Sequence, residues 1–308
     1  MTFKHLLYTP FTGLGLYGGF RGNRWLRNRI KVFKQFVLPS LKAQTNQNFT
    51  VWISWRQEEK NNHIVQEFIQ DLEIYYPPWA IGGPRIVNTF HGLCFWDDKF
   101  SDKEARDKLM TNLHDTMGEL VDVVGDVDYV YMTIQSSDDC YHQSAVMGIQ
   151  AVFKETDYQA FGFKQGYIMN YLTKEIANYN PSTNPPFFTI KFTRTQFTDP
   201  SKHAAYTGPY KSHEYIGQYL KYGTVEERGF IVGCHSENIS THFTHPFKGQ
   251  TVSDEVLKDF GLYDVASLKI KTSVRRAILR RLPHWWQKKL RYWIGERFYS
   301  RFYNWIRG

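Results

Sequence analysis

Apolar residues recur with a helical period in several stretches of the chain. In the segment RWLRNRIKVFKQFVLPSLKAQ, which spans residues 24–44, Leu26, Ile30 and Phe33 fall on one stripe. Pro39 predicts a bend or a restart near the end of that helix. The same period predicts further helices over residues 64–76, 101–125, 146–153 and 213–220. Each of these helices would bury one apolar face.

Between the helical stretches, β-branched and aromatic residues form short runs that are typical of strands. The clearest runs are FTVWISW, residues 49–55, and DYVYMTIQ, residues 128–135. Further strands are predicted over residues 4–11, 85–92, 160–172, 185–192 and 227–234. Strands that alternate with helices predict an α/β sandwich around a mostly parallel central sheet.

The segment GLGLYG, residues 13–18, matches the G-x-G-x-x-G fingerprint of dinucleotide-binding proteins. In that motif a helix starts at the glycines and an acidic residue follows about 20 residues later. Here the helical period begins only near Arg24, and residues 32–44 contain no Asp or Glu. The pattern therefore favours a glycine loop over a dinucleotide-binding oxidoreductase, with Arg21 or Arg24 as a partner for phosphate.

Composition and charge divide the chain into two parts. The 308 residues carry a net charge of +8. Residues 269–308 contain 12 Lys or Arg and one acid, a local charge of 12 − 1 = +11, so residues 1–268 carry 8 − 11 = −3. We therefore expect a body over 1–268 and a basic tail over 269–308, and no binding of nucleic acid by the mildly acidic body.

The cysteines and the apolar runs favour a cytoplasmic protein. The three cysteines are far apart and form no C-x-x-C pair, which argues against a disulfide framework or a structural zinc site. The chain opens without a long apolar run, and nowhere are there about 18 consecutive apolar residues. We expect neither a signal peptide nor a transmembrane helix.

In a sheet of this class, ligands bind beyond the carboxyl ends of the strands. One predicted strand ends in SSDD, and its carboxylates Asp138 and Asp139 could hold a divalent cation through oxygen ligands. Equally, either aspartate could cap the helix that follows. Another strand runs into HSENIS, where His235, Glu237 and Asn238 form either a site loop or a polar surface turn.

Several of these segments resemble those of a GT-A-type glycosyltransferase, and in their order they are similar to the "putative rhamnosyltransferase" family. The resemblance covers residues 5–245. It rests on RWLRNR for the family's W-L-x-x-R helix, LPSLKAQT for its L-P-S-L-x-x-Q-T, the SSDD turn for D-S-D-D, and HSEN for H-x-x-N.

The resemblance implies a nucleotide-sugar donor, with dTDP-rhamnose as a candidate, and a glycan or glycolipid acceptor. It places Asp138 at the second acid of the DxD motif and implies a Mg²⁺ or Mn²⁺ ion held by Asp138 with His235. Ser136 stands where the first acid is expected, which puts the metal in doubt. The strand end ISWRQEE lacks the family's acid for the nucleobase or ribose, and Glu58 is its substitute.

Donor binding and proton transfer need further residues. A diphosphate leaving group needs charge neutralisation, for which Arg21, Arg24 and Lys211 are candidates, and an acceptor hydroxyl needs a base. The candidate bases are Asp139, Glu214 and Glu237, and the alternative for each is an ordinary solvated acid. The full set of expected donor-binding residues is Phe11, Arg21, Arg24, Glu58, Ser136, Asp138, Lys211 and Asn238.

The basic tail predicts contact with a membrane surface. After Pro283, Trp286, Leu290, Trp293 and other apolar residues recur in steps of three and four, and cations lie between them. A basic amphipathic helix rich in Trp binds in the interface of an anionic membrane without spanning it. This would make the protein a peripheral membrane protein, although the tail could also pack on the body as an ordinary terminal helix.

Two classes of function are therefore consistent with the sequence. The first is a cytoplasmic glycosyltransferase at the membrane face. The second is a non-enzymatic adaptor that binds a membrane or nucleic acid and uses the body as a nucleotide-binding-like scaffold. A nucleoside diphosphate should stabilise the first and not the second.

Overall fold

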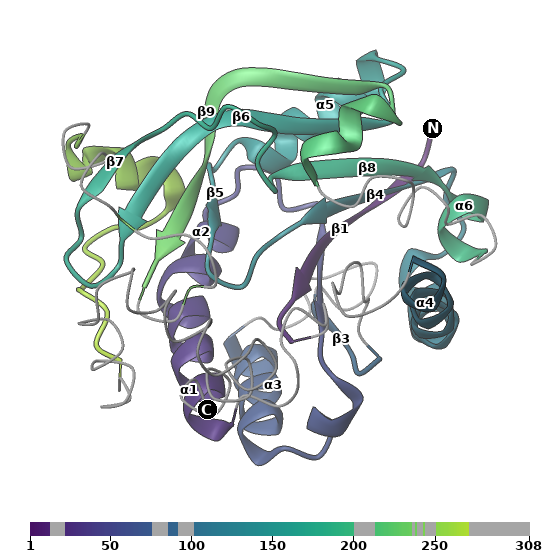
Figure 1. The fold of residues 1–308 in the computed structure, drawn as a ribbon, viewed down its shortest axis with the longest axis horizontal. Helices are drawn as coiled ribbons and strands as arrows, with labels where there is room; N and C mark the ends of the chain where they lie inside the picture. The colour runs from purple at the N-terminus through teal and green to yellow at the C-terminus, as the bar shows by residue number, and fades with distance from the viewer. Residues whose placement is uncertain are drawn as a thin grey trace, which may run out of the picture.

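The computed structural model of the chain shows one large sheet with helices on both faces (Figure 1). It describes residues 1–12, 22–75, 86–91, 102–199, 213–235, 238, 243 and 251–270. The strands are β1 (Phe3–Pro10), β2 (Thr50–Ser54), β3 (Ile86–Thr89), β4 (Tyr129–Ile134), β5 (Cys140–Tyr141), β6 (Ala160–Asn170), β7 (Ile176–Tyr179), β8 (Phe188–Thr193) and β9 (Tyr222–Cys234). The expected α/β class is confirmed.

The sheet has the order β3-β2-β1-β4-β8-β6-β9-β5, and β7 pairs with β6. Strands β3, β2, β1 and β4 are parallel to one another. Strand β8 is antiparallel to both β4 and β6, and β9 is parallel to β6. The reversal at β8 therefore aligns β6 and β9 with β1 and β4, so the carboxyl ends of these strands point toward the same side of the molecule.

The helical segment after the glycine loop consists of three consecutive pieces. These are α1 (Asn23–Val32), the π-helix η1 (Phe33–Val37) and α2 (Leu38–Lys42). Pro39 has no N–H to donate within the helix, and the wider π turn precedes it. The restart that the sequence predicts near Pro39 is confirmed, and its cause is a local change in the helical hydrogen-bond register.

The remaining helices are distributed over the two faces of the sheet. They are the 3₁₀ turns η2 (Gln57–Glu59), η4 (His213–Gln218) and η5 (Asp254–Phe260), and the helices α3 (His63–Tyr75), α4 (Asp102–Val124), α5 (Ala145–Glu155) and α6 (Arg194–Thr198). Alternate residues of β1 show the two faces, because Leu7 packs under α1 and α3 while Leu6 packs with Leu120 of α4.

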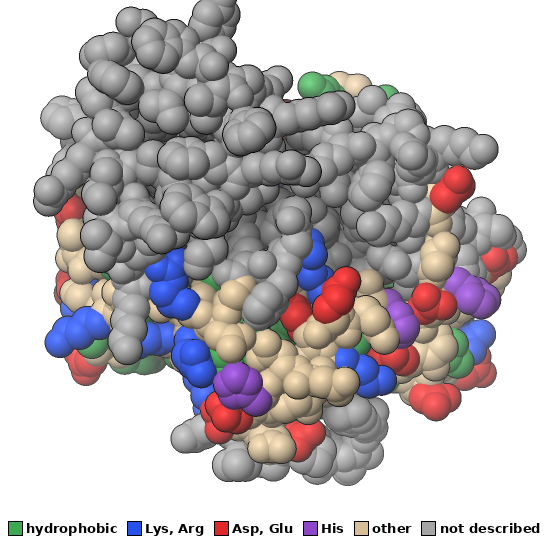
Figure 2. Space-filling view, turned by 60° about the horizontal axis from the view of Figure 1, so that its bottom comes forward, with side chains coloured by type: hydrophobic (Ala, Val, Ile, Leu, Met, Phe, Trp, Pro, Cys, Tyr) green, Lys and Arg blue, Asp and Glu red, His purple; other side chains and the backbone are tan. Residues whose placement is uncertain are grey.

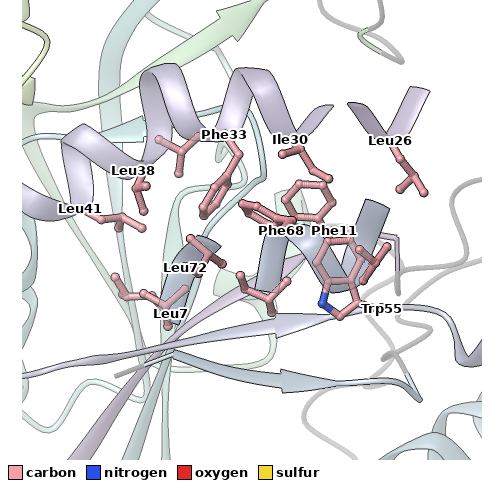
Figure 3. Close-up of a cluster of buried hydrophobic side chains, with 14 of the residues drawn as sticks. Leu7, Phe11, Leu26, Ile30, Phe33, Leu38, Leu41, Trp55, Phe68 and Leu72 are labelled. Carbon is pink, nitrogen blue, oxygen red and sulfur yellow. The ribbon is translucent and has the colours of Figure 1, made fainter. Parts of the chain in front are cut away.

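Figure 3 shows the core between the sheet and the helices α1 and α3. Phe11 lies at its centre, with ring centroids 4.5 Å from Trp55, 5.6 Å from Phe33 and 5.7 Å from Phe68. Aromatic pairs at these separations contribute about 0.5–1.5 kcal/mol each beyond their burial. This core fixes α1 against the carboxyl ends of β1 and β2.

The segment of residues 251–270 packs back onto the start of the chain. The Leu268 N–H donates to the Tyr171 carbonyl (2.7 Å), and Lys31 Nζ of α1 donates to the Lys269 carbonyl (2.6 Å). Leu257 and Phe260 of η5 are buried in the same cluster as Tyr171. Residues 251–270 therefore pack on the rest of the described chain, and residues 271–308 lie outside the described part.

Among the described strands and α-helices, three short elements were not expected from the sequence. Strands β5 and β7 have two and four residues, and α6 has five. Such lengths are too short to show a period, so only pairing with longer neighbours reveals them. In the part of the chain that the structure describes, no helix combines the length and the apolarity that crossing a bilayer requires.

Candidate active site

The candidate active site lies where the segments after β4 and β9 meet. Asp138 follows β4, and His235 follows β9 directly. His235 Nε2 lies 3.1 Å from Asp138 Oδ2, although the two residues are 97 positions apart in the chain. The two polar loops that the sequence singled out are thus brought together at the expected edge of the sheet.

A buried arginine of α1 completes this cluster. Arg29 Nη1 is 2.5 Å from Asp138 Oδ2, and the arginine side chain is 5% exposed. The same nitrogen is 3.2 Å from His235 Nε2. That histidine nitrogen can donate to Asp138 or accept from Arg29, and its tautomer decides which. Because Asp138 is also only 14% exposed, the pair is a desolvated ion pair.

Asn238 fastens the loop that carries His235. Its side chain accepts a hydrogen bond from the His235 N–H and donates to the Gly233 carbonyl (2.6 Å). Its Nδ2 also lies 3.3 Å from Asp138 Oδ2. Asn238 therefore links the end of β9 to the carboxylate of Asp138, and His235 is buried at 6% exposure.

Charge holds Asp138 in its ionised form. Burial alone would raise the pKa of Asp138, but the Arg29 guanidinium and His235 outweigh burial and hold this pKa well below its usual range. Arg29, His235 and Asn238 all contact the same oxygen, Oδ2. The carboxylate of Asp138 is thus a fixed negative charge that is paired from the protein side.

The pKa of the neighbouring Asp139 is shifted in the opposite direction. Burial, and then the charge of Asp138, raise the pKa of Asp139 to about 8. Its Oδ1 accepts a hydrogen bond from the Gly233 N–H (2.9 Å), and Gln135 donates to its carbonyl (2.8 Å). Two adjacent aspartates therefore differ in protonation at neutral pH, which is typical of acid–base sites.

Neither aspartate caps the following helix. Helix α5 begins at Ala145 with Ser144 at its N-cap position, and β5 lies between Asp139 and that helix. The capping alternative for Asp138 and Asp139 is therefore wrong. Their side chains are directed instead to Gly233, His235 and Asn238.

Buried aromatic side chains support the turn that contains Asp138. The Tyr171 hydroxyl donates to the Asp138 carbonyl (2.8 Å), and the Tyr171 ring stacks on Phe36 with centroids 3.6 Å apart. Phe36 lies in the π-helix, and its carbonyl accepts a hydrogen bond from the Cys140 thiol (3.4 Å). The π-helix therefore supplies both a ring and a carbonyl to the elements that position Asp138.

At the end of β2, the buried acid is Glu59 and not Glu58. Glu58 is exposed, whereas Glu59 is 2% exposed and accepts a hydrogen bond from the Thr12 hydroxyl. The Arg56 N–H also donates to Glu59 (3.2 Å). Burial raises the pKa of Glu59 despite these bonds. Glu59 therefore ties the segment after β2 to Thr12, which lies just after β1.

The other expected site residues lie in different surroundings. Phe11 is 1% exposed in the core of Figure 3, where aromatic rings surround it. Arg24 is half-buried in the first turn of α1, and Ser136 is half-buried and hydrogen-bonds Asp139. Glu214 is exposed on η4 and accepts from Thr183 (3.1 Å). Arg21, Lys211, Glu237 and the fingerprint 13–18 lie outside the described residues.

The residues of the cluster do not fit the expected divalent cation. A DxD-type site offers the ion two ionised carboxylates, but here Ser136 replaces one acid and Asp139 is bonded to backbone at Gly233. Asp138 Oδ2 already lies against the cation of Arg29. Among the described residues, no group of three His, Cys, Asp or Glu side chains could hold a metal ion.

Arg29 and Glu59 are the two residues of this site that sequence reasoning did not select. Arg29 is the final residue of the W-L-x-x-R segment Trp25–Arg29, so the motif itself contained the signal. Glu59 is next to the candidate that was selected, Glu58, and the side of a 3₁₀ turn on which each acid falls decides which one is buried.

Comparisons with known proteins agree with the expected family over part of the chain. Residues 21–72 match the sequence model of a family described as "Putative rhamnosyl transferase". This confirms the resemblance over a segment that contains both Arg29 and Glu59. No curated protein matches the sequence of the chain.

Three solved structures are similar at 11% identity. S. aureus TarS 1-349 covers 76% of this chain with a TM-score of 0.37, and its complex with UDP-GlcNAc covers 84% with a TM-score of 0.39. A "putative nucleotide-diphospho-sugar transferase" from Desulfovibrio desulfuricans G20 covers 76% with a TM-score of 0.34. The matches span 60%, 64% and 82% of those chains, respectively. Likeness at this level supports no argument about function.

Proposed function

We propose that this protein is a glycosyltransferase that moves a sugar from a nucleotide-sugar donor to a glycan or glycolipid acceptor. The observation that carries the proposal is the buried cluster of Arg29, Asp138, His235 and Asn238 at the carboxyl edge of the sheet. The match of residues 21–72 to a rhamnosyl transferase family supports the same class and makes rhamnose the candidate sugar.

The chemistry of glycosyl transfer matches the charges of this cluster. The donor leaves as a nucleoside diphosphate, so the transition state needs positive charge and hydrogen-bond donors at the phosphates. Arg29, Arg21, Arg24 and Lys211 are our candidates for that role. Asn238 and Ser136 complete the set of polar residues that we assign to the donor.

An acceptor hydroxyl also needs a base, and Asp139 is our first candidate. A carboxylate whose pKa is raised to about 8 is a stronger base than an ordinary aspartate, and about a tenth of it is ionised at pH 7 and able to accept the proton. Asp139 lies beside Asp138 in the cluster, whereas Glu214 is exposed on η4. Glu237, the third candidate, follows His235 by two positions in the loop after β9.

The membrane surface is the proposed location of the acceptor. The described body carries acidic, basic and histidine side chains interspersed over the face in Figure 2. Cations are concentrated instead in residues 269–308, where 12 Lys or Arg stand against one acid. We therefore assign contact with an anionic, lipid-linked acceptor surface to this tail.

Donor hydrolysis measured on a panel of UDP-, dTDP- and GDP-sugars tests the proposal. The wild-type protein should release nucleoside diphosphate from at least one donor, and Asp138→Asn should lower that rate by about 100-fold or more. Asparagine is preferable to alanine because it keeps the volume of the side chain and an oxygen acceptor. Either change removes the carboxylate that pairs with Arg29, at a cost of about 3–5 kcal/mol, so circular dichroism must show that the variant is folded.

The matched control is Asp126→Asn. Asp126 is exposed and precedes the amino end of β4, so it lies on the opposite side of the sheet from Asp138. The control should keep wild-type rates. A protein that hydrolyses none of the donors and gains no thermal stability from any nucleoside diphosphate would contradict the proposed activity and favour the adaptor alternative.

A further inference from the structure

An arginine is already present where a divalent cation would have to bind. Three nitrogen atoms surround Asp138 Oδ2, namely Arg29 Nη1 at 2.5 Å, His235 Nε2 at 3.1 Å and Asn238 Nδ2 at 3.3 Å. Mg²⁺ binds carboxylate oxygens at about 2.0–2.1 Å. An ion on this oxygen would have to displace these donors and lie next to the guanidinium charge, which repels it.

The positive charge of Arg29 balances the negative charge of Asp138 without a metal ion. In a site with two ionised carboxylates, a divalent cation brings the local charge to zero. Here serine at position 136 removes one of those negative charges, and the single positive charge of Arg29 balances the one carboxylate of Asp138. Arg29 belongs to the W-L-x-x-R motif that the family shares, and with serine at position 136 its charge is matched by the carboxylate of Asp138 alone.

Arg29 is buried, and its side chain lies against the ring of Trp25. It lies within α1, its guanidinium carbon is 5.4 Å from the centroid of the Trp25 ring, and its side chain is 5% exposed. Arginine stays charged under all ordinary conditions and presents a planar fork of donors that suits phosphate oxygens. Its charge is thus a permanent part of the site.

We propose that Arg29 takes the place of the divalent cation, and that this site stabilises the diphosphate of its donor without a metal ion. The inference rests on the proposed glycosyltransferase function. It assigns Arg29 as a residue of the donor site and Ser136 as the position that makes the site independent of metal.

The first test measures Mn²⁺ binding by the loss of the free-ion signal in electron paramagnetic resonance, and it needs no nucleotide. The wild-type chain should leave the signal of free Mn²⁺ unchanged. The double variant Arg29→Ala with Ser136→Asp removes the guanidinium and restores the second acid, so it should bind Mn²⁺. Mn²⁺ binding by the wild type that Asp138→Asn abolishes would overturn the proposal.

The matched control is Arg27→Ala with Ser136→Asp. Arg27 lies on the same helix and is exposed, so this variant has the second acid but keeps the Arg29 guanidinium. It should not bind Mn²⁺. If it binds the ion as well as the Arg29 variant does, Arg29 is not what excludes the metal. Circular dichroism of both variants establishes that they are folded.

The second test uses the wild type alone and decides the matter even if the Arg29 variant fails to fold. Calorimetry measures the binding of UDP, dTDP and GDP in EDTA and in excess Mn²⁺. The affinity should be the same in both, whereas an increase of about tenfold or more with Mn²⁺ would overturn the proposal. If no nucleotide binds at all, the proposed function fails, and the Mn²⁺ measurement still decides the role of Arg29.

Discussion

Gly233, the next-to-last residue of β9, lies so close to Asp138 that no side chain fits between them. A Cβ atom at this position would be 2.1 Å from the Asp138 carbonyl oxygen and 2.5 Å from the Tyr171 ring. The close approach is also what allows the Gly233 N–H to reach Asp139. Glycine is needed here for space and not for an unusual backbone angle.

Gly233→Ala should therefore destabilise the protein by about 1–3 kcal/mol, because the turn of Asp138 or the ring of Tyr171 must move. Chemical denaturation measures this change. Gly148→Ala is the control, since Gly148 is exposed within α5 with no atom near its Cβ position, and alanine there should stabilise the helix slightly. Equal stability of Gly233→Ala and the wild type would show that the turn adjusts freely.

Asp139 should make the protein less stable as the pH rises. Its pKa is about 8 in the folded chain and 3.8 as an ordinary aspartate, so between these values the folded state binds more protons than the unfolded state. Stability from this group is complete below the lower value and is lost at up to about 1.4 kcal/mol per pH unit toward the upper one.

Asp139→Asn removes this dependence while keeping an acceptor for the Gly233 N–H. As the pH rises from 5 to 8, the wild type should lose more free energy of unfolding than the variant does. This window lies between the two pKa values. Urea unfolding at several pH values measures it. A difference that stays constant with pH would mean that Asp139 is ionised in the folded protein.

Among the elements, β1, β4, β8 and α5 are joined by a buried chain of hydrogen bonds. Gln150 Nε2 of α5 lies 3.1 Å from His5 Nδ1, His5 Nε2 lies 2.7 Å from the Thr133 hydroxyl, and that hydroxyl is 2.6 Å from Thr189. The amide nitrogen of Gln150 can only donate, so His5 accepts at Nδ1 and donates from Nε2. Burial lowers the pKa of His5 to about 3 and keeps the ring neutral.

This network should make the sheet sensitive to acid. The unfolded chain takes up a proton on His5 below the ordinary histidine pKa of 6.5, whereas the folded chain does so only near 3. Stability should therefore fall with decreasing pH through this range, by up to about 1.4 kcal/mol per unit from this group.

The free energy of unfolding of His5→Gln, measured from pH 7 to pH 4, should depend less steeply on pH than that of the wild type. His63→Gln is the control because His63 is exposed at the start of α3. If His5→Gln and His63→Gln change the slope equally, the neutral state of His5 does not govern acid stability.

At the scale of the whole molecule, we expect a body and a separate basic tail. Leu268 is 4% exposed, and both Leu268 and Lys269 are hydrogen-bonded to the body. A truncated protein should therefore end at Ile270, two residues beyond the boundary that charge alone predicts. That truncation keeps η5 and its buried contacts intact.

The full-length protein should sediment with vesicles that contain anionic lipid, and the protein of residues 1–270 should stay in the supernatant. Each Lys or Arg near an anionic surface contributes about 1 kcal/mol, and salt should weaken the binding. Vesicles of neutral lipid are the control. If both proteins sediment alike, residues 271–308 do not carry the membrane contact.

The sequence by itself determined the helices and longer strands, the α/β class, the restart near Pro39 and the two polar loops at strand ends. These features depend on local periodicity, on proline geometry and on the rule that ligands bind at carboxyl ends of strands. A segment of ten residues contains all the information that such an assignment needs.

Only the tertiary structure decided which residues meet. The reversal at β8 aligns β9 with β4, and this topology brings His235 to Arg29 across 206 residues of sequence. The buried surroundings then shift the pKa values of the two aspartates in opposite directions. Asp138 is paired with the Arg29 guanidinium, whereas Asp139 accepts a hydrogen bond from the backbone N–H of Gly233. Local patterns do not encode strand direction or desolvation, and these two properties set the charge of the site.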